Sequence, residues 1–425
     1  VNAALPQFFD EVDKVQQSRP FLTTLRGCLG QAWELWPVCL ADIVADMRSA
    51  ERNYLAAETL LALAATRSRD LVARTRDTRQ RAEWAWAMLS DHAWNGTDEA
   101  NRRHNAELRR RWARDLQTAA DALGQEAWKT LDAKADPACL TVFNPLSFAR
   151  SALLAVEVAP TVTGIAHAGK ELPSQIVHED GRRILYAVLN DVQPCAMVAL
   201  ELTSASSAPA GATTSADRLE SPQYRLRVDR DTGALASLFH RPTGRELALS
   251  GRRGLGQIVC RDGQDRTLET VRCDSVADGP VLSRLRVHGR CGAMTATTFI
   301  TVYHALDRVD LDCRVEKPAD LPVERMVHFF PVHQGGELRV ETTGAILRPF
   351  AQPRGDLLAG ADTRRFTVQG FMDWSDNEAG MTVVPWDAFA FRLDLGAPAF
   401  QAMGYDQNPR EVLHDQDRQT RFRFR

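Results

Sequence analysis

The sequence predicts a multidomain protein in which an N-terminal helical bundle is followed by antiparallel β-sandwich domains. Up to about Lys134, strong helix formers dominate and apolar residues recur three and four positions apart, the pattern of amphipathic helices. After Asp136-Pro137 the apolar period changes to two, which is typical of strands with one buried face. We therefore expect a bundle over 1–134, a first sandwich portion over 135–205 and a large antiparallel sandwich over 206–425.

We expect four helices in the first part, and the pattern gives bounds for three of them. Apolar side chains form one stripe and charged side chains another over 40–65, and a second helical pattern spans about 75–89. The Asn95-Gly96 pair marks a turn, after which Thr97 is a suitable N-cap for a third helix reaching about Leu123. Together these helices predict a compact bundle. We expect four tryptophans of these segments in its core: Trp84, Trp86, Trp112 and Trp128.

The rest of the chain alternates apolar and polar residues, as in ALLAVEVAP and ILYAVLNDV. His178-Glu179-Asp180 has the HxD spacing that can chelate a metal, but Gly181 follows it between two strand patterns, so we interpret it as a hairpin turn. Residues 203–216 are small and polar without periodicity, which predicts a surface loop or linker between two β units. His328 and His333 lack companions at ligand spacing, and we interpret them as strand residues.

Composition and charge exclude several classes of protein. Lysine and arginine number 52 against 55 aspartate and glutamate, so the bulk positive field of a dedicated nucleic-acid binder is missing. No window approaches the roughly 18 uninterrupted apolar residues of a membrane span, so we expect a soluble protein. The 8 cysteines are scattered and form no CxxC, which favours a reduced, cytoplasmic setting. The sequence starts with Val1 rather than Met and shows no signal peptide, so we expect that residues precede it.

Single residues leave the chemistry open. His92, in LSDHAWNGT, is a candidate metal ligand, but zinc needs three or four converging ligands, so a structural or capping role is the alternative. Trp33 and Trp36 are candidates to pack against the apolar face of a sugar ring, although core packing is the more frequent use. No GxSxG or HExxH motif is present, and no pair of carboxylates can be assigned as the acid and nucleophile of a glycosidase.

Five strings in the same order resemble the middle and C-terminal regions of the glycoside hydrolase family 38 α-mannosidases. AWELWPVCLADIVADMRSAERNYLAAETL is similar to a family segment in which a tryptophan, an arginine and a glutamate keep the spacing of Trp33, Arg48 and Glu58. LSDHAWNGTDEAN resembles the stretch that carries a zinc-binding histidine, which His92 matches. Many family members place an aspartate after that histidine, whereas here Asp91 precedes it.

The other three strings lie in the β part. TVFNPLSFARSALLAVEV resembles the family's entry strand with its Asn-Pro pair, here Asn144-Pro145. SPQYRLRVDRDTGALASLFHRPTGREL is similar to its long sandwich hairpin. DRVDLDCRVEKPADLPVERMVHFFPV resembles a strand pair that ends in Phe-Pro, with Lys317 and Pro331 in the matching places.

This resemblance implies a zinc-dependent retaining α-mannosidase that acts on mannose-containing oligosaccharides, with a β part of the galactose-mutarotase-like supersandwich type. It carries over only His92 as a zinc ligand and Trp33 as a residue that contacts the sugar. Asp91 is a candidate either to contact the sugar or to hold a zinc ligand in place. The nucleophile, the acid and the other zinc ligands belong to an N-terminal catalytic domain, which we expect to be a missing partner of this chain. The chain alone is therefore expected to be inactive.

Two alternatives remain at this point. The chain is either the C-terminal part of such an enzyme or a non-catalytic carbohydrate-binding or structural subunit. A binding protein unrelated to the family, with an incidental bundle, is a third alternative that the ordered strings disfavour. If a catalytic domain docks on the bundle, the docking face should be apolar, and the isolated chain should then associate into a homo-oligomer.

Overall fold

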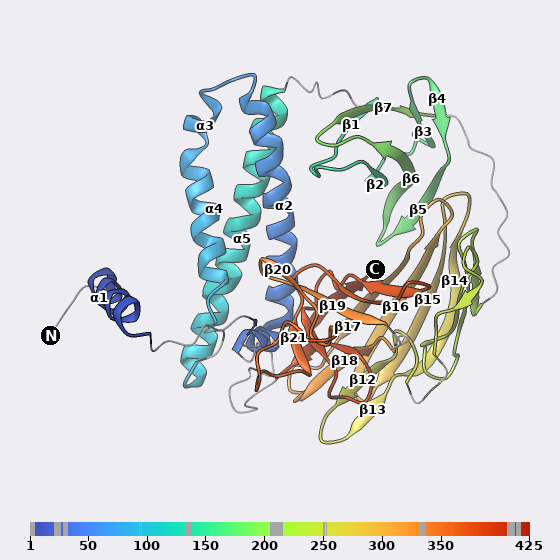
Figure 1. The fold of residues 1–425 in the computed structure, drawn as a ribbon. Coiled ribbons are helices and arrows are strands. Elements are labelled where there is room, and N and C mark those ends of the chain that lie inside the picture. Colours follow the sequence, from blue (N-terminus) through green and yellow to red (C-terminus); the bar gives the residue numbers. More distant parts are fainter. Residues whose placement is uncertain are drawn as a thin grey trace.

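The protein is described by a computed structural model, in which helices come first and strands make up the rest (Figure 1). The described residues are 5–20, 27–28, 33–92, 94, 96–131, 136, 138–204, 216–249, 251, 253–331, 336–405, 413 and 418–425, with only the backbone of 33–35. This order confirms the predicted class of a helical bundle followed by antiparallel sheets. His333 and most of the predicted linker at 203–216 lie outside the described residues.

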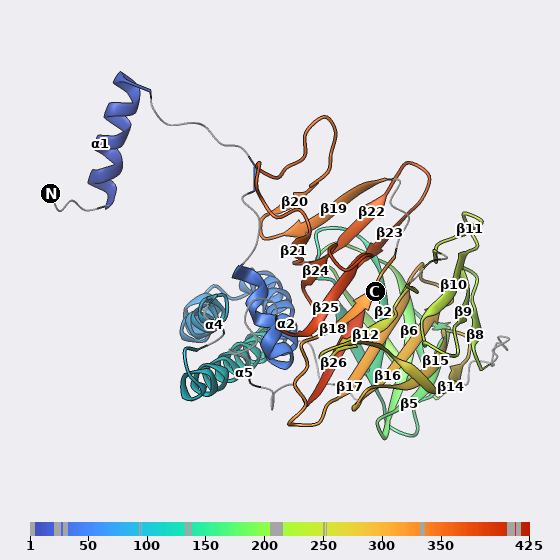
Figure 2. The same ribbon diagram turned by 90° about the horizontal axis from the view of Figure 1, so that it is seen from below.

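The helical part contains six segments among the described residues. They are α1 (Leu5–Ser18), the 3-10 helix η1 (Trp33–Leu40), α2 (Ala41–Ala65), α3 (Leu71–Arg74), α4 (Arg76–Leu89) and α5 (Glu99–Thr130). Helices α2, α4 and α5 lie side by side as the bundle, whereas α1 stands apart from it (Figures 1 and 2). The expected N-cap Thr97 is wrong by one residue, because the carboxylate of Asp98 accepts the hydrogen bond from the backbone N–H of Asn101 at 2.9 Å. None of these described helices is long and apolar enough to cross a membrane.

The bundle core is rich in alanine, which lets the helices approach closely. Helix α4 buries a stripe made of Ala82, Ala85 and Leu89. Trp84 lies off this stripe and is 66% exposed, so its predicted place in the core is wrong. The other three tryptophans expected there do pack against the core: Trp86, Trp112 and Trp128. Exposed apolar side chains on the bundle also include Leu55 and Val72, but a docking face for a further domain stays a prediction.

Residues 138–204 form a small sandwich of two antiparallel sheets. One sheet has the order β1 (Cys139–Phe143), β7 (Met197–Thr203), β3 (Gly164–His167), β4 (Lys170–Leu172). The other has the order β2 (Arg150–Glu157), β6 (Arg182–Val192), β5 (Ser174–Glu179). Asn144 of the Asn-Pro pair is buried, and its amide donates to the carbonyls of Phe148, Val192 and Gln193 at 2.9–3.1 Å. The side chain of Asn144 therefore ties the entry of this sandwich to its longest strand.

The expected turn at His178-Glu179-Asp180 is confirmed as the connection between β5 and β6. Asp180 and Gly181 have φ angles of 51° and 77°. These left-handed conformations suit a tight hairpin whose residues are Asp-Gly. The turn points away from the small sandwich toward the next part of the chain, where Arg314 donates to Asp180 at 2.6 Å.

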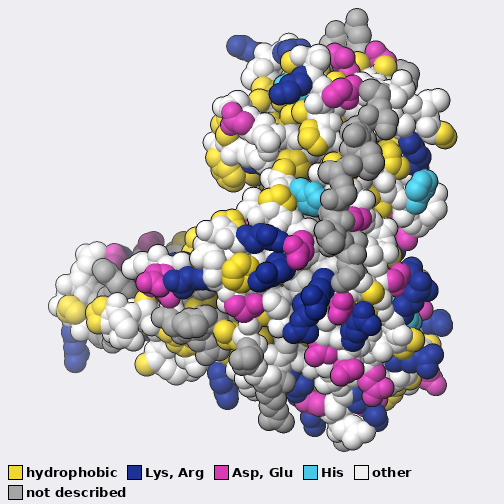
Figure 3. All heavy atoms as spheres, turned by 90° about the vertical axis from the view of Figure 1, so that its right-hand side faces the viewer, with side chains coloured by type: hydrophobic (Ala, Val, Ile, Leu, Met, Phe, Trp, Pro, Cys, Tyr) yellow, Lys and Arg dark blue, Asp and Glu magenta, His cyan; other side chains and the backbone are white. Residues whose placement is uncertain are grey.

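Residues 216–425 form the large β part, in which four antiparallel sheets share one hydrophobic core. The five-stranded sheet has the order β14 (Glu269–Asp278), β15 (Leu282–Cys291), β16 (Met294–Tyr303), β17 (Val309–Glu316), β26 (Gln419–Phe424). The six-stranded sheet has the order β13 (Asp265–Thr267), β12 (Ile258–Arg261), β18 (Arg325–Phe329), β25 (Ala399–Gly404), β24 (Ala390–Arg392), β21 (Arg365–Thr367). Two four-stranded sheets are β11 (Arg245–Glu246), β10 (Leu235–His240), β9 (Tyr224–Val228), β8 (Arg218–Glu220), and β20 (Ala345–Leu347), β19 (Glu337–Thr342), β22 (Met372–Ser375), β23 (Gly380–Val383). Figure 3 shows the small sandwich as a lobe above this part, whose surface mixes basic and acidic side chains.

Two of the strings in the large β part can be compared with its strands. The long hairpin is confirmed, because β9 and β10 pair antiparallel. The strand pair expected over DRVDLDCRVEKPADLPVERMVHFFPV is wrong, because its two strands, β17 and β18, belong to different sheets. Strand β17 pairs instead with β26 at the end of the chain. Lys317, where the two sheets separate, is buried and donates to the carbonyl of Pro318 at 3.2 Å.

A single buried arginine joins the bundle to the large β part. The guanidinium of Arg48, on α2, donates to the carbonyls of Trp386 at 3.1 Å, Val368 at 3.2 Å, Gln369 at 2.8 Å and Pro385 at 2.9 Å. Arg48 is 5% exposed, and burial lowers the pKa of its guanidinium. Because the planar fork of arginine has five donors, one side chain can satisfy carbonyls from two segments at once.

Replacing Arg48 with alanine should separate the bundle from the sheets. The variant loses four charge-assisted hydrogen bonds in a buried place and leaves a cavity, so we expect the free energy of unfolding to fall by about 3–5 kcal/mol. Urea unfolding followed by tryptophan fluorescence measures this change. The control is Arg69→Ala, which removes an exposed arginine just after α2 and should change the value by less than about 0.5 kcal/mol. Equal losses in both variants would contradict the interpretation.

His328 is a buried strand residue, as expected, and its burial has a consequence for acid stability. Its ring centroid lies 4.9 Å from that of Phe424 and 6.0 Å from that of Phe422. Nε2 has no hydrogen-bond partner among the described residues. Burial lowers the pKa of His328 to about 3. An unfolded chain binds this proton below about pH 6.5, whereas the folded chain does not until far lower.

Free energy of unfolding should therefore fall as the pH drops from about 6.5 toward 3. By linkage, His328 alone accounts for roughly 2–3 kcal/mol of loss between pH 6.5 and 4.5. His328→Phe should remove this part of the acid sensitivity while the carboxylates keep theirs. Urea unfolding of both proteins across this pH range measures the difference in slope. His104→Gln, at an exposed position of α5, is the control, and parallel curves for wild type and His328→Phe would disprove the assignment.

Candidate functional site

His92 and Asp91 line a cavity of about 200 Å³ between the bundle and the large β part. We call it the His92 cavity. The bundle side comes from the start of α2, with Val44 and Met47, and from the end of α4. The opposite wall comes from the β19–β20 hairpin and the segment after β21, with Thr343 and Gln369. Two of the three predicted site residues thus share one cavity, although nothing in the fold alone tests what they bind.

The connection between α4 and α5 positions these two residues. Helix α4 ends where the N–H of Ser90 donates to the carbonyl of Trp86 at 3.0 Å. Trp94 is 2% exposed and anchors the loop, and its N–H donates to the carbonyl of His92 at 2.8 Å. A Cβ atom at Gly96 would lie 2.6 Å from the backbone nitrogen of Arg102. The loop can therefore meet the first turn of α5 only with glycine at this position.

An ion pair with a buried arginine fixes the orientation of Asp91. Nη2 of Arg109, on α5, lies 3.4 Å from Oδ2 of Asp91, and Oδ1 of Asp91 lies 3.2 Å from Nδ1 of His92. The Arg109 guanidinium carbon is 5.0 Å from the ring centroid of Trp94 and 5.8 Å from that of Trp112. Burial lowers the pKa of Arg109, while Asp91 opposes this shift. The order Arg109, Asp91, His92 leads from the bundle core to the cavity.

Asp91 and His92 lie at the cavity mouth rather than in its depth. Their side chains are 45% and 57% exposed, in contrast to 3% for Arg109. A carboxylate that accepts from Nδ1–H fixes the tautomer, so Nε2 is the nitrogen that would bind a metal. This matches the orientation of metal-bound histidines, whose second ring nitrogen is held by a carboxylate or carbonyl.

These residues do not make a zinc site by themselves. Structural and catalytic zinc sites need three or four protein ligands. Within the part of the chain that the structure describes, no group of three or more His, Cys, Asp and Glu side chains converges. His92 is one suitable ligand, and Asp91 is already engaged with Arg109. Zinc binding therefore stays a prediction, and it requires ligands other than the described residues of this chain.

The third predicted site residue cannot be placed. Trp33 begins η1, but its side chain lies outside the described residues. Pro37 of the same helix lines the cavity, so η1 does reach the site. A contact between Trp33 and a sugar stays a prediction.

Several residues of the site were not anticipated. Arg109 gives no signal in the sequence, because α5 contains many arginines and the sequence does not show which of them faces the core. The threonines and the glutamine of the opposite wall lie about 250 residues from His92. Only the tertiary fold brings them to the same cavity.

Two solved structures share this fold over 98% of the chain. A glycosyl hydrolase family 38 protein from Enterococcus faecalis matches with a TM-score of 0.70 at 12% identity, and an α-mannosidase from Enterococcus faecalis V583 with a TM-score of 0.69 at 14% identity. The chain has the fold of a family 38 glycosyl hydrolase. It spans 59% of the first structure and 58% of the second, so it corresponds to only part of either protein.

Other comparisons gave a weaker structural match or none. A galactose mutarotase-like protein from Lactobacillus casei ATCC 334 matches 49% of this chain and 98% of its own, with a TM-score of 0.30 at 12% identity. No model of a known protein family and no curated protein matches the sequence. At these identities the likeness to the two Enterococcus structures establishes the fold, and the chemistry must be argued from the residues.

Replacing Arg109 with leucine tests whether it orders the site loop. Asp91 would lose its buried partner and Trp94 its cation, so we expect the free energy of unfolding to fall by about 2–4 kcal/mol. Exposure of Trp94 should also shift the fluorescence emission to longer wavelength. Arg111→Leu, two residues along the same helix at an exposed position, is the matched control. The interpretation fails if both variants unfold and fluoresce like the wild type.

Proposed function

We propose that this chain forms the bundle and β-sandwich part of a zinc-dependent retaining α-mannosidase that removes terminal α-D-mannosyl residues from oligosaccharides. One observation carries the proposal: His92, oriented by Asp91 and Arg109, lies at the mouth of a cavity in a fold shared with family 38 structures. His92 would be one zinc ligand. The other ligands, the nucleophile and the acid would come from a catalytic domain that precedes Val1.

Five residues at the His92 cavity have a role in this proposal. Arg109 holds Asp91, and Asp91 holds the imidazole of His92 in one tautomer. The zinc ion, when bound, would coordinate hydroxyl groups of the terminal sugar. Thr343 and Gln369 would face that sugar from the large β part, since hydroxyl and amide groups suit hydroxyl-rich ligands.

His92→Ala in the longer polypeptide, translated in frame from upstream of Val1, tests the assignment. We expect zinc content and the hydrolysis of an aryl α-mannoside to fall at least about 100-fold, because a direct ligand matters more than the supporting residues, whose loss costs 10–100-fold. Asp91→Asn should show this smaller loss. His104→Ala is the control, since His104 is exposed on α5.

Other outcomes would count against the proposal. Unchanged zinc content and rate in His92→Ala would remove His92 from the site. Robust zinc-dependent turnover by the 425-residue chain alone would contradict the need for a separate catalytic domain.

A non-catalytic carbohydrate-binding subunit is the second candidate. It is favoured by the walls of the His92 cavity, which this chain supplies on both sides. Calorimetry of the 425-residue chain with methyl α-mannoside distinguishes the two. Saturable binding without zinc, together with a start codon at Val1, would support the subunit.

A further inference from the structure

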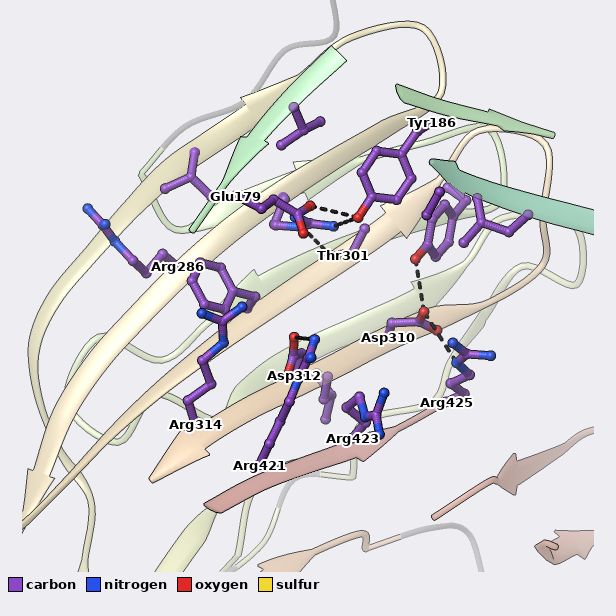
Figure 4. A pocket seen from close by; sticks show the side chains of 18 of the residues that line it. Glu179, Tyr186, Arg286, Thr301, Asp310, Asp312, Arg314, Arg421, Arg423 and Arg425 are labelled. Carbon is purple, nitrogen blue, oxygen red and sulfur yellow. Dashed lines mark hydrogen bonds and ion pairs between the residues drawn. The ribbon is translucent and has the colours of Figure 1, made fainter. Parts of the chain in front are cut away.

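A second cavity of about 350 Å³ lies where the small sandwich meets the five-stranded sheet. We call it the arginine cleft. Its upper wall comes from β2, β5, β6 and their hairpin turn, and its floor from strands β15, β16, β17 and β26 (Figure 4). It shares no lining residue with the His92 cavity. Its volume falls in the range of about 300–1,000 Å³ that small-molecule sites occupy.

The floor of the arginine cleft is the polar face of the five-stranded sheet. Alternate residues of a strand point to the same face, and Arg421 and Arg423 alternate along β26, with Arg425 directly after its end. Figure 4 shows these arginines and Arg314 of β17 extending from neighbouring strands. The residues between them, such as Phe422 and Phe424, point the other way into the core. The strand pattern therefore concentrates cations on one side of the sheet.

Arginines are concentrated in the cleft although the whole protein is slightly acidic. Six arginines and four carboxylates line it, and Asp274 and Asp387, outside the lining, pair with Arg286 and Arg423. The net charge of the chain is −3. Arg314 and Arg421 lie directly opposite each other on paired strands, an arrangement that is unfavourable for like charges. Burial and the neighbouring Arg308 and Arg423 lower the pKa of Arg425 to about 10, against the effect of Asp310.

The carboxylates in the cleft do not use all the N–H donors of its arginines. Arg421 is held by both oxygens of Asp312, at 2.7 and 2.5 Å. Arg314, in contrast, donates one side-chain hydrogen bond among the described residues, to Asp180, and Arg286 donates one, to Asp274 at 2.7 Å. Each guanidinium has five N–H groups in a planar fork, so Arg286 and Arg314 keep donors for another acceptor.

An aromatic ring lies between these two arginines. Phe299 of β16 is the direct partner of Arg286 on β15, and the Arg314 guanidinium carbon is 4.9 Å from its ring centroid. Aromatic faces in sites of this kind pack against apolar faces of sugars and other ring compounds. The cleft thus combines an aromatic ring with two cationic forks, of which Arg314 lies over one face of the ring.

We propose that the arginine cleft binds a small anionic ligand, a sugar or similar ring compound that bears a carboxylate or a phosphate group. Arg286 and Arg314 contact the anionic group, because the guanidinium fork matches the geometry of both groups. Phe299 supports the ring of the ligand. Asp180, at the tip of the small-sandwich hairpin, occupies Arg314 in the absence of ligand and competes with it. The proposal is independent of the mannosidase activity, which concerns neutral sugars.

Calorimetry of the 425-residue chain at constant low ionic strength tests this proposal with four probes. They are glucose 6-phosphate, glucuronate, inorganic phosphate and glucose. We expect saturable one-to-one binding of glucose 6-phosphate, of glucuronate or of both, and none of glucose. Which anion binds identifies the recognised group, and binding of inorganic phosphate as tight as that of glucose 6-phosphate would exclude a role for the ring and for Phe299. The proposal is overturned if no anion binds saturably with a Kd below about 10 mM, which corresponds to a binding free energy of roughly 3 kcal/mol.

Two variants with a matched control locate the site. Arg286→Gln with Arg314→Gln should weaken binding at least tenfold. Arg241→Gln with Arg245→Gln removes two arginines that are ion-paired with Glu220 and Glu378 outside the cleft, and should leave the affinity unchanged. Equal weakening in both double variants would reveal only a general effect of charge and overturn the assignment.

A third variant keeps the proposal testable if the first one does not fold. Asp180→Asn should strengthen binding several-fold, because it removes the carboxylate that competes for Arg314. Asparagine accepts the left-handed backbone of this turn, so the hairpin should be preserved. An unchanged or weaker affinity in Asp180→Asn would show that Arg314 does not contact the ligand.

Discussion

The buried guanidinium of Arg48 is the contact on which the arrangement of the two halves depends. Its four acceptors are backbone carbonyls of two segments, 368–369, which follows β21, and 385–386, which lies beside the end of β26. A buried cation is tolerated only when its donors are satisfied, and these carbonyls are equally in need of donors. Trp386 adds a second layer, because Arg52 of the same helix both donates to its carbonyl at 2.9 Å and stacks on its ring at 4.7 Å. The bundle can therefore rest on the sheets in one register only.

The same contact shapes the His92 cavity. Val368 and Gln369, whose carbonyls bind Arg48, also line the cavity, and Arg48 itself forms part of its wall. A shift of α2 along the sheets would move both walls relative to His92. The site is thus assembled at an interface between two parts of the fold, where small-molecule sites are frequent. The hydrogen bonds of Arg48 fix the position of both cavity walls. His92, which is exposed at the cavity mouth, is therefore presented to a ligand in a fixed geometry.

Local rules account for much of the fold, and long-range pairing accounts for the rest. Helix α2 begins within one residue of its predicted start, because its apolar stripe is continuous. The hairpin at Asp180-Gly181 follows from turn chemistry alone. The pairing of β17 with β26 does not, because about a hundred residues separate them and periodicity carries no information on partners. Trp84 was misplaced for a related reason, since its hydrophobicity favours the core but the phase of α4 turns it outward. His92 was found through a resemblance, whereas Arg109 needed the fold.

The arginines of this protein separate into two groups by what surrounds them. Arg48 and Arg109 are nearly fully buried, and carbonyls, tryptophan rings and one carboxylate surround them. Their cations serve the architecture, although Nε of Arg109 has no hydrogen-bond partner among the described residues. Arg286 and Arg314 are about one-third exposed, and each keeps donors beyond its one carboxylate. An exposed pair of this kind contributes little to stability, so stability does not explain why Arg314 faces Arg421 across a strand pair. Facing arginines also occur on other strand pairs, such as Arg365 and Arg392. What favours an anion in the arginine cleft is therefore the pair Arg286 and Arg314, whose spare donors lie beside a cavity.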